Sequence, residues 1–171
     1  AASKSSSFLL SRFIATQWLL NGIDVNEEMR LFKLQDYITS GSPDALNTNE
    51  EGVLLGAGIA KKMSLVIGDR IQVSNVRGDR TYLKIVGIFQ SGLAEVDNVQ
   101  SYANLKMVQR ILGEGESYIT DINVKMYQMD DAIHMGKDIE QIFDVTATDI
   151  QTTNAQFETG TSIRNMITYA V

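Results

Sequence analysis

The chain has 171 residues, of which 44% are hydrophobic, and a formal net charge of -6. This length buries enough apolar surface for one compact domain or two small subdomains. The absence of cysteine excludes disulfides and thiolate metal sites, and the acidic balance argues against a nucleic-acid partner, because such proteins bind phosphates through basic patches.

Both ends of the sequence bear on membrane attachment. No run of about 18 apolar residues occurs, so the sequence as given predicts no bilayer-spanning segment. Residues 163–171 become increasingly apolar, which predicts that a transmembrane helix follows. Residues 1–7 are polar and of low complexity, without the apolar core of a signal peptide, and predict a flexible end.

The first third of the chain predicts strands followed by one helix. Residues 8–23 mix Leu, Phe, Ile, Trp and Thr, which favours one or two strands ending at a turn formed by residues 21–22. Asn26 is suited to cap a helix that carries acids in its first turn and runs to about Tyr37. Residues 40–43, which include the single proline, end this helix.

The next segment predicts a strand, a short helix and a hairpin. Residues 52–56 form a short apolar run typical of a strand, and residues 57–63 have helical spacing. Polar and apolar residues then alternate over residues 69–74 and again over residues 81–86. The sequence Arg-Gly-Asp at residues 77–79 lies between them and predicts a hairpin turn.

Two more strands and a helix are expected before residue 114. Residues 86–90 and 99–103 have strand composition and are separated by a loop over residues 91–98. A helix is predicted over residues 105–112, with Gly113 supplying the left-handed residue at its end.

The final third predicts a β-α-β unit packed on a sheet, which makes the fold class α+β. The expected elements are a strand over residues 122–127, a helix over residues 130–143, a strand over residues 145–150 and a second helix toward the carboxyl end. One stripe of the first helix is expected to face the sheet, and it consists of Ala132, Gly136, Ile139 and Phe143.

A nucleotide-binding enzyme is an alternative raised by residues 55–58, Leu-Gly-Ala-Gly, which resemble the start of a dinucleotide fingerprint. Lys61 stands where the third glycine would be, and a hairpin pattern follows instead of a crossover helix. We therefore favour a close-packed turn between strand and helix. A small soluble nucleotide-binding α/β enzyme remains the remote alternative.

No catalytic, metal or cofactor site is predicted. His134 is the only histidine and is turned away from the apolar stripe of its helix, which favours a solvated surface position. Residues 130–131, both Asp, are better explained as a helix cap than as metal ligands. Trp18 has apolar neighbours, and we expect it to be buried.

Five residues are candidates for contact with a partner protein. Glu95 and Asp97 flank Val96 in a glycine-bearing loop, where a solvated loop is the main interpretation and partner contact the alternative. Arg77 and Asp79, at the turn of the predicted hairpin, are the other two candidates.

Five motifs occur in order over about 90 residues: NGIDVNEE (21–28), LQDYITSG (34–41), GVLLGAGIA (52–60), IGDRIQV (67–73) and IVGIFQSG (85–92). Together they resemble the extracytoplasmic loop of the FtsX/MacB/Lol family of ABC-transporter permeases. Within that family the chain looks most like the lipoprotein-releasing permeases of the LolC/LolE type. Met63 and Ser64 depart from the pattern, because the family usually has leucine and glycine there.

The resemblance implies a loop between the first and second transmembrane helices of a permease in the bacterial inner membrane, facing the periplasm. It also implies two α+β lobes. A porter-like lobe would consist of residues 1–50 and 114–171, and a small strand-rich lobe of the Sabre type would consist of residues 51–113.

The implied function is non-catalytic: the domain would take part in lipoprotein release by coupling ATP-driven motion to cargo handling. The implied partners are a second permease subunit, a cytoplasmic ATPase subunit and the lipoprotein cargo. Residues 75–80 are too few for the hook-like hairpin of members that recruit a periplasmic chaperone, so we do not expect chaperone recruitment. A MacB-like efflux permease and an FtsX-like activator of cell-wall hydrolases are the alternatives.

Overall fold

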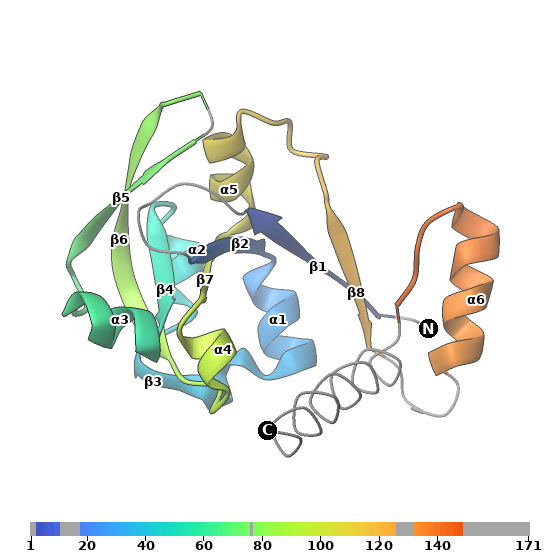
Figure 1. Cartoon of the computed structure of the whole chain (residues 1–171), viewed down its shortest axis with the longest axis horizontal. Helices are drawn as coiled ribbons and strands as arrows, with labels where there is room; N and C mark the ends of the chain where they lie inside the picture. The colour runs from blue at the N-terminus through green and yellow to red at the C-terminus, as the bar shows by residue number, and fades with distance from the viewer. Residues whose placement is uncertain (1–2, 11–17, 76, 126–131, 149–171) are drawn as a thin grey trace, which may run out of the picture. The chain divides into compact units, whose positions relative to one another are not determined.

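The computed structural model describes residues 3–10, 18–75, 77–125 and 132–148. The chain divides into two compact units, residues 1–125 and 126–171, and each is described here by itself. The described part of the first unit is a mixed β-sheet with helices, which confirms the α+β class (Figure 1).

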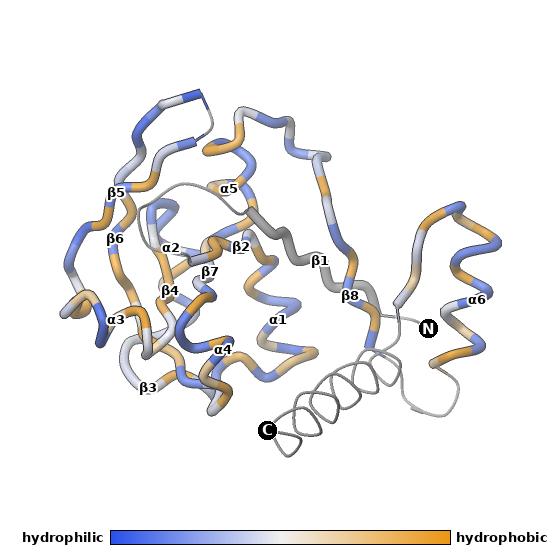
Figure 2. The backbone as a smooth tube through the Cα atoms, in the orientation of Figure 1, coloured by the Kyte–Doolittle hydropathy of each residue, from blue (hydrophilic) through white to orange (hydrophobic). Residues whose placement is uncertain are grey.

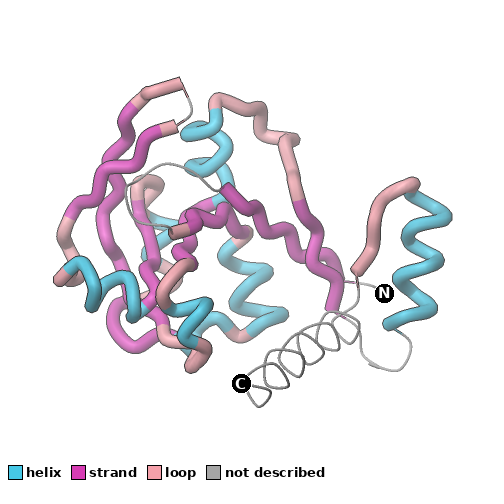
Figure 3. Tube along the Cα trace, in the orientation of Figure 1, coloured by secondary structure: helices cyan, strands magenta, loops and turns pink. Residues whose placement is uncertain are grey.

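An eight-stranded sheet is the main feature of the first unit, with the strand order β3-β6-β4-β7-β2-β1-β8 and with β5 paired to β6 (Figure 3). The strands are β1 (Ser3–Leu10), β2 (Leu19–Ile23), β3 (Ile38–Gly41), β4 (Gly52–Gly56), β5 (Arg70–Ser74), β6 (Arg80–Phe89), β7 (Gln100–Asn104) and β8 (Asp121–Lys125). The pairs β2/β7 and β4/β6 are parallel, and the remaining pairs are antiparallel.

Strand β4 lies inside the sheet, and all five of its residues are buried. Because side chains alternate between the two faces of a strand, Val53 and Leu55 pack into one hydrophobic cluster and Leu54 packs into the other. The hydrophobic stretches of β4 and β6 are visible in Figure 2. Both faces of the sheet are therefore covered here.

Helices α3 (Ala57–Met63) and α5 (Leu105–Leu112) cover the first face, through Ile59, Met107, Val108 and Ile111. The second face is covered by α1 (Val25–Phe32), the 3₁₀ helix η1 (Leu34–Tyr37), α2 (Ala45–Thr48) and α4 (Ala94–Asp97). This second face carries the site described below.

Helix α1 starts and ends where its flanking residues dictate. Its N-cap is Asp24, whose Oδ1 accepts hydrogen bonds of 3.1 Å from the amides of Asn26 and Glu27. The predicted cap at Asn26 was wrong, because that residue already lies inside the helix. Lys33 takes a left-handed conformation (φ 53°) and ends α1, so the single helix predicted to Tyr37 is two helices.

The turn predicted at residues 21–22 is also absent, since both residues lie inside β2. A Cβ atom on Gly22 would lie 2.8 Å from the Cβ of Val108, so the glycine allows α5 to pack closely on this strand. The predicted strand over residues 86–90 is the second half of the long strand β6, and the loop over residues 91–98 contains α4.

Several sequence predictions are confirmed. Strand β4 and helix α3 have the predicted bounds, and β5 and β6 form the predicted hairpin with Gly78 at φ 88°. Helix α5 covers residues 105–112 and ends at Gly113, which has φ 73°. Strand β8 falls within one residue of its predicted start, and residues 126–127 lie outside the described residues.

The described part of the second unit contains α6 (Ala132–Phe143). The stripe predicted to be buried is half-buried at Ala132, Gly136 and Ile139, but Phe143 is 60% exposed. Residues 145–148 form no strand, so the prediction over residues 145–150 was wrong for this part. Residues 130–131, 149–150 and the second carboxyl-terminal helix lie outside the described residues.

The predicted lobe boundaries, at residues 50/51 and 113/114, do not coincide with the boundary of the compact units after Lys125. Strand β2, from the first predicted lobe, pairs with β7 from the second. The two-lobe arrangement stays a prediction.

Candidate interaction site

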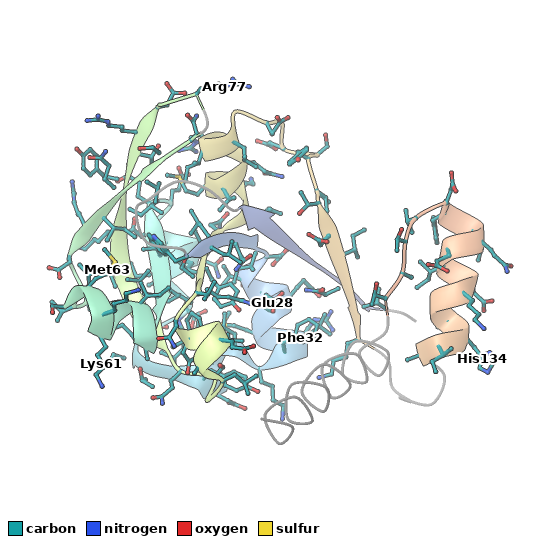
Figure 4. All side chains as sticks on the ribbon, in the orientation of Figure 1. Glu28, Phe32, Lys61, Met63, Arg77 and His134 are labelled. Atoms are coloured by element: carbon teal, nitrogen blue, oxygen red, sulfur yellow. The ribbon has the colours of Figure 1, made fainter. Side chains whose placement is uncertain are left out.

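The five predicted contact residues lie on two separate elements. Arg77 and Asp79 belong to the β5–β6 turn, and Glu95, Val96 and Asp97 belong to α4. Figures 1 and 4 show the turn and α4 far apart in the first unit. The structure therefore does not bring these residues together into one site.

Asp97 is 7% exposed, and its carboxylate organises the loop before α4. It accepts hydrogen bonds from the amide of Ser91 at 2.7 Å, from the hydroxyl of Ser91 at 2.8 Å and from the amide of Gly92 at 3.3 Å. The expectation that this residue belongs to a solvated loop was wrong, because the Asp97 side chain is itself buried and its carboxylate is satisfied by these hydrogen bonds. Glu95, by contrast, is exposed.

The β5–β6 turn is attached to the end of α5. The side-chain amide of Asn75 donates a hydrogen bond of 3.0 Å to the carbonyl oxygen of Ile111 in that helix. The guanidinium group of Arg77 lies close to Gly113, where a Cβ atom on the glycine would be 2.9 Å from one of its nitrogens. A cation beside the carboxyl end of a helix interacts favourably with the helix dipole. Arg77 and Asp79 are both exposed to solvent.

Val96 leads to a feature that the sequence did not reveal, an open pocket of about 150 Å³ on the second face of the sheet. The pocket is lined by Ile23, Glu28, Phe32, Leu34, Tyr37, Phe89, Ser91, Val96 and Tyr102. Its buried walls are Ile23, Leu34 and Phe89, whereas Phe32 and Tyr37 are 36% and 45% exposed. The exposed rings make the pocket accessible from solvent.

Local structure explains how α1 and η1 contribute to this pocket. Glu28 and Phe32 are four residues apart on α1 and therefore share one face of the helix (Figure 4). The left-handed Lys33 then redirects the chain into η1, which brings Tyr37 to the same pocket. The break between the two helices, missed at the sequence level, thus shapes the site.

Tyr102 is a titratable residue of this pocket whose pKa is clearly shifted. Its pKa is raised to about 12, first by burial and then by the negative charges of Glu28 and Asp97. The hydroxyl donates a hydrogen bond of 2.8 Å to Oε1 of Gln100, and the ring lies 5.0 Å from that of Phe89. The pocket therefore combines aromatic walls with a negative potential.

A cation already contacts one wall of the pocket. The ammonium group of Lys125 lies 5.8 Å from the ring centre of Phe32 and donates a hydrogen bond of 2.5 Å to the carbonyl oxygen of Leu31. This distance is within the range of a cation–π interaction.

The glycines at residues 56 and 58 serve packing. A Cβ atom on Gly56 would lie 2.2 Å from the carbonyl oxygen of Asp97, and one on Gly58 would lie 2.0 Å from Oδ1 of Asn98. Helix α4 therefore occupies the space in which a dinucleotide fingerprint would receive a pyrophosphate. The predicted close-packed turn is confirmed.

His134 is exposed on α6, as predicted (Figure 4). Trp18, which was predicted to be buried, is only half-buried and packs against the cluster on the first face. Among the described residues, no group of three or more His, Cys, Asp or Glu side chains could hold a metal ion. No helix within those same residues has the length and apolarity needed to cross a bilayer.

Comparison with known proteins connects this structure to a transporter family. No family model matches the chain. It is 25% identical over 130 residues, or 71% of its length, to the lipoprotein-releasing system transmembrane protein LolC of Xylella fastidiosa, in both the Temecula1 and 9a5c strains.

Two solved structures share the fold. The extracellular domain of the noncanonic ABC-type transporter YknZ from Gram-positive bacteria has a TM-score of 0.55 and 15% identity, covering 85% of this chain and 77% of that one. The periplasmic region of MacB from Actinobacillus actinomycetemcomitans has the same TM-score and identity, covering 92% and 73%. The chain is similar to the extracytoplasmic domains of FtsX/MacB/LolC-type ABC permeases, with distant homology to LolC over 71% of its length. The resemblance carried by the five sequence motifs is thereby confirmed at the level of this permease type.

The chain spans 31% of the length of the curated relatives that it matches.

Proposed function

We propose that this domain takes part in lipoprotein release from the bacterial inner membrane. It would be the periplasmic part of a permease that couples ATP-driven motion of a cytoplasmic ATPase subunit to the handling of cargo. The observation that supports this proposal is the 25% identity to LolC, which extends over 130 residues. The proposed partners are a second permease subunit, the ATPase subunit and the lipoprotein.

The packing of the sheet suits a domain that transmits motion. Central strand β4 is buried on both faces, and two clusters of apolar side chains attach helices to it. Close-packed interiors have low compressibility and move as rigid bodies. We propose that the first unit, in which strands of the predicted porter-like and strand-rich lobes share one sheet through β2 and β7, moves as one such body between two transmembrane helices.

The β5–β6 turn bears on chaperone recruitment. A recruiting hook has to project from the domain, whereas this turn is hydrogen-bonded to the end of α5 through Asn75. The attachment supports the expectation that this permease does not recruit a chaperone through the hairpin. Arg77, Asp79 and Glu95 remain proposed contact residues for the other partners.

A MacB-like efflux permease is the second candidate, because the MacB periplasmic region covers 92% of this chain at a TM-score of 0.55. An FtsX-like activator of cell-wall hydrolases shares the same domain type. These alternatives differ in the protein that contacts the domain.

Photo-crosslinking in cells tests the proposal. A photoreactive amino acid would replace Leu93, which is 65% exposed beside α4, Glu95 or Arg77 in the full-length permease. We expect crosslinks to a lipoprotein and to a second permease subunit, identified by mass spectrometry. The exposed Tyr82 of β6 is the matched control position. Crosslinks to an efflux adaptor or to a cell-wall hydrolase would instead support the corresponding alternative.

A further inference from the structure

We propose that the pocket between α1, η1 and α4 binds a single arginine or lysine side chain presented by a protein partner. The inference goes beyond the proposed function, because it concerns the chemistry of recognition and does not depend on the cargo of the permease.

The size of the pocket sets the size of its occupant. It encloses about 150 Å³, and a protein cavity of roughly 150 Å³ holds a molecule about as large as benzene. One long side chain fits these dimensions.

The walls favour a cation with an apolar stem. Four of the nine lining residues are aromatic: Phe32, Tyr37, Phe89 and Tyr102. The face of an aromatic ring is negative and attracts lysine and arginine. The remaining apolar walls suit the methylene groups that link such a charged group to its backbone.

The carboxylates of Glu28 and Asp97 beside the pocket attract a cation, whereas the ammonium group of Lys125 lies at the Phe32 wall. Glu28 is among the lining residues, and no lysine or arginine is. Glu28 and Asp97 are both close enough to raise the pKa of Tyr102. Complementary charge of this kind gives specificity in protein recognition.

Lys125 provides an intramolecular example of the same chemistry. Its ammonium group lies 5.8 Å from the ring centre of Phe32, a residue that lines the pocket. The Phe32 ring is thus positioned to interact with a cation in this fold.

A protein side chain fits better than a lipid headgroup. Choline is also a cation that aromatic residues bind, but in a phospholipid it is attached to a phosphate. That phosphate would lie next to Glu28, and like charges in an interface cost binding free energy. We therefore assign the pocket to a basic residue of a protein.

NMR titration of the 171-residue chain tests this assignment with three short peptides that are blocked at both ends and differ only at the central residue. That residue is arginine, lysine or norleucine, which has an unbranched stem but no charge. We expect the arginine and lysine peptides to shift the ring resonances of Tyr37 and Tyr102. The norleucine peptide should bind about tenfold more weakly, in line with a desolvated cation–π interaction.

Variants locate the binding. Glu28→Gln and Phe32→Leu should each weaken the arginine peptide about threefold to tenfold. Glu27→Gln removes the same charge one residue away, outside the pocket lining, and should leave the affinity unchanged. The amide spectrum of each variant reports whether the fold is intact.

Three outcomes would overturn the proposal: equal binding of the norleucine and arginine peptides, unchanged affinity in a folded Glu28→Gln variant, or binding of phosphocholine without binding of either basic peptide. None of these measurements involves a lipoprotein. A failure here is therefore distinguishable from a failure of the crosslinking experiment.

Discussion

Asn75 and Ile111 are joined by a hydrogen bond of 3.0 Å from the side-chain amide of Asn75 to the carbonyl oxygen of Ile111. The side-chain oxygen of Asn75 accepts hydrogen bonds of 2.9 Å from the amides of Arg77 and Asp79. One side chain therefore shapes the β5–β6 turn and also attaches it to the carboxyl end of α5, where carbonyl groups lack helical partners.

Replacing Asn75 should loosen this turn. Asn75→Ala leaves the turn amides and the helix carbonyl without their protein partner, and we expect a loss of about 0.5–1.5 kcal/mol in the free energy of unfolding, because water can reach these groups. Urea denaturation measures the loss, and amide hydrogen exchange at Arg77 and Asp79 should become faster. Arg80→Ala, at an exposed position of the same hairpin, should change the stability by less than about 0.5 kcal/mol. Equal stability of the two variants would contradict the role of Asn75.

Gly56 is required by its contact with α4. In Gly56→Ala the new methyl group would lie 2.2 Å from the carbonyl oxygen of Asp97, and we expect a destabilisation of about 2–3 kcal/mol from overpacking. Gly115→Ala is the matched control, because nothing lies within 4 Å of a Cβ atom there. Denaturation of both variants should show a lower free energy of unfolding for Gly56→Ala alone.

ATP or NAD added to the protein in calorimetry should give no binding heat. Tight nucleotide binding that Gly58→Val abolishes would instead support the enzyme alternative.

Ser64 stands at a position that favours glycine. It ends α3 with φ 54° and ψ 40°, in the left-handed region that residues with a Cβ atom adopt unfavourably. Ser64→Gly should raise the free energy of unfolding by about 0.5–1 kcal/mol, after allowance for the greater freedom of glycine in the unfolded chain. Ser74→Gly, in the extended strand β5, should lower it by a similar amount. A destabilised Ser64→Gly variant would show that the serine side chain has a further role.

Tyr102 should make stability depend on alkaline pH. Its pKa is about 12 in the folded protein, whereas a tyrosine ordinarily has a pKa of 10.0, so between these pH values the folded state binds more protons than the unfolded state. The stability that the folded protein gains from keeping Tyr102 protonated is fully present below pH 10 and is lost as the pH rises through about 12. In Tyr102→Phe the free energy of unfolding should therefore decline less steeply over this interval.

The measurement for Tyr102 is a series of urea denaturation curves across that pH interval. Tyr82→Phe, which removes the phenol hydroxyl of a 53% exposed tyrosine in β6, is the control. Its free energy of unfolding should decline with pH as steeply as that of the parent protein. If Tyr102→Phe declines as steeply as the parent protein, another group causes the alkaline destabilisation.

Local sequence features were sufficient to predict a helix or strand where a few neighbouring residues decide its conformation. The spacing of apolar residues and Gly113 placed α5 at residues 105–112, and the alternation around Gly78 placed the β5–β6 hairpin. The prediction at Gly22 failed because the glycine serves close packing under α5, not a turn. The turn propensity of glycine cannot distinguish a turn from close packing, because Val108, the residue that requires a glycine at position 22, is distant in sequence.

The pocket depended on tertiary structure. Phe89 and Tyr102 come from β6 and β7, and their rings lie 5.0 Å apart although β4 is inserted between those strands in the sheet. Tyr37 joins them because Lys33 turns the chain between α1 and η1. The sequence by itself determined β4, α3, α5, the β5–β6 hairpin and the permease motifs, because these depend on local spacing. Strand order is decided by burial of apolar surface between distant segments, and that burial alone brought the aromatic residues and Glu28 together.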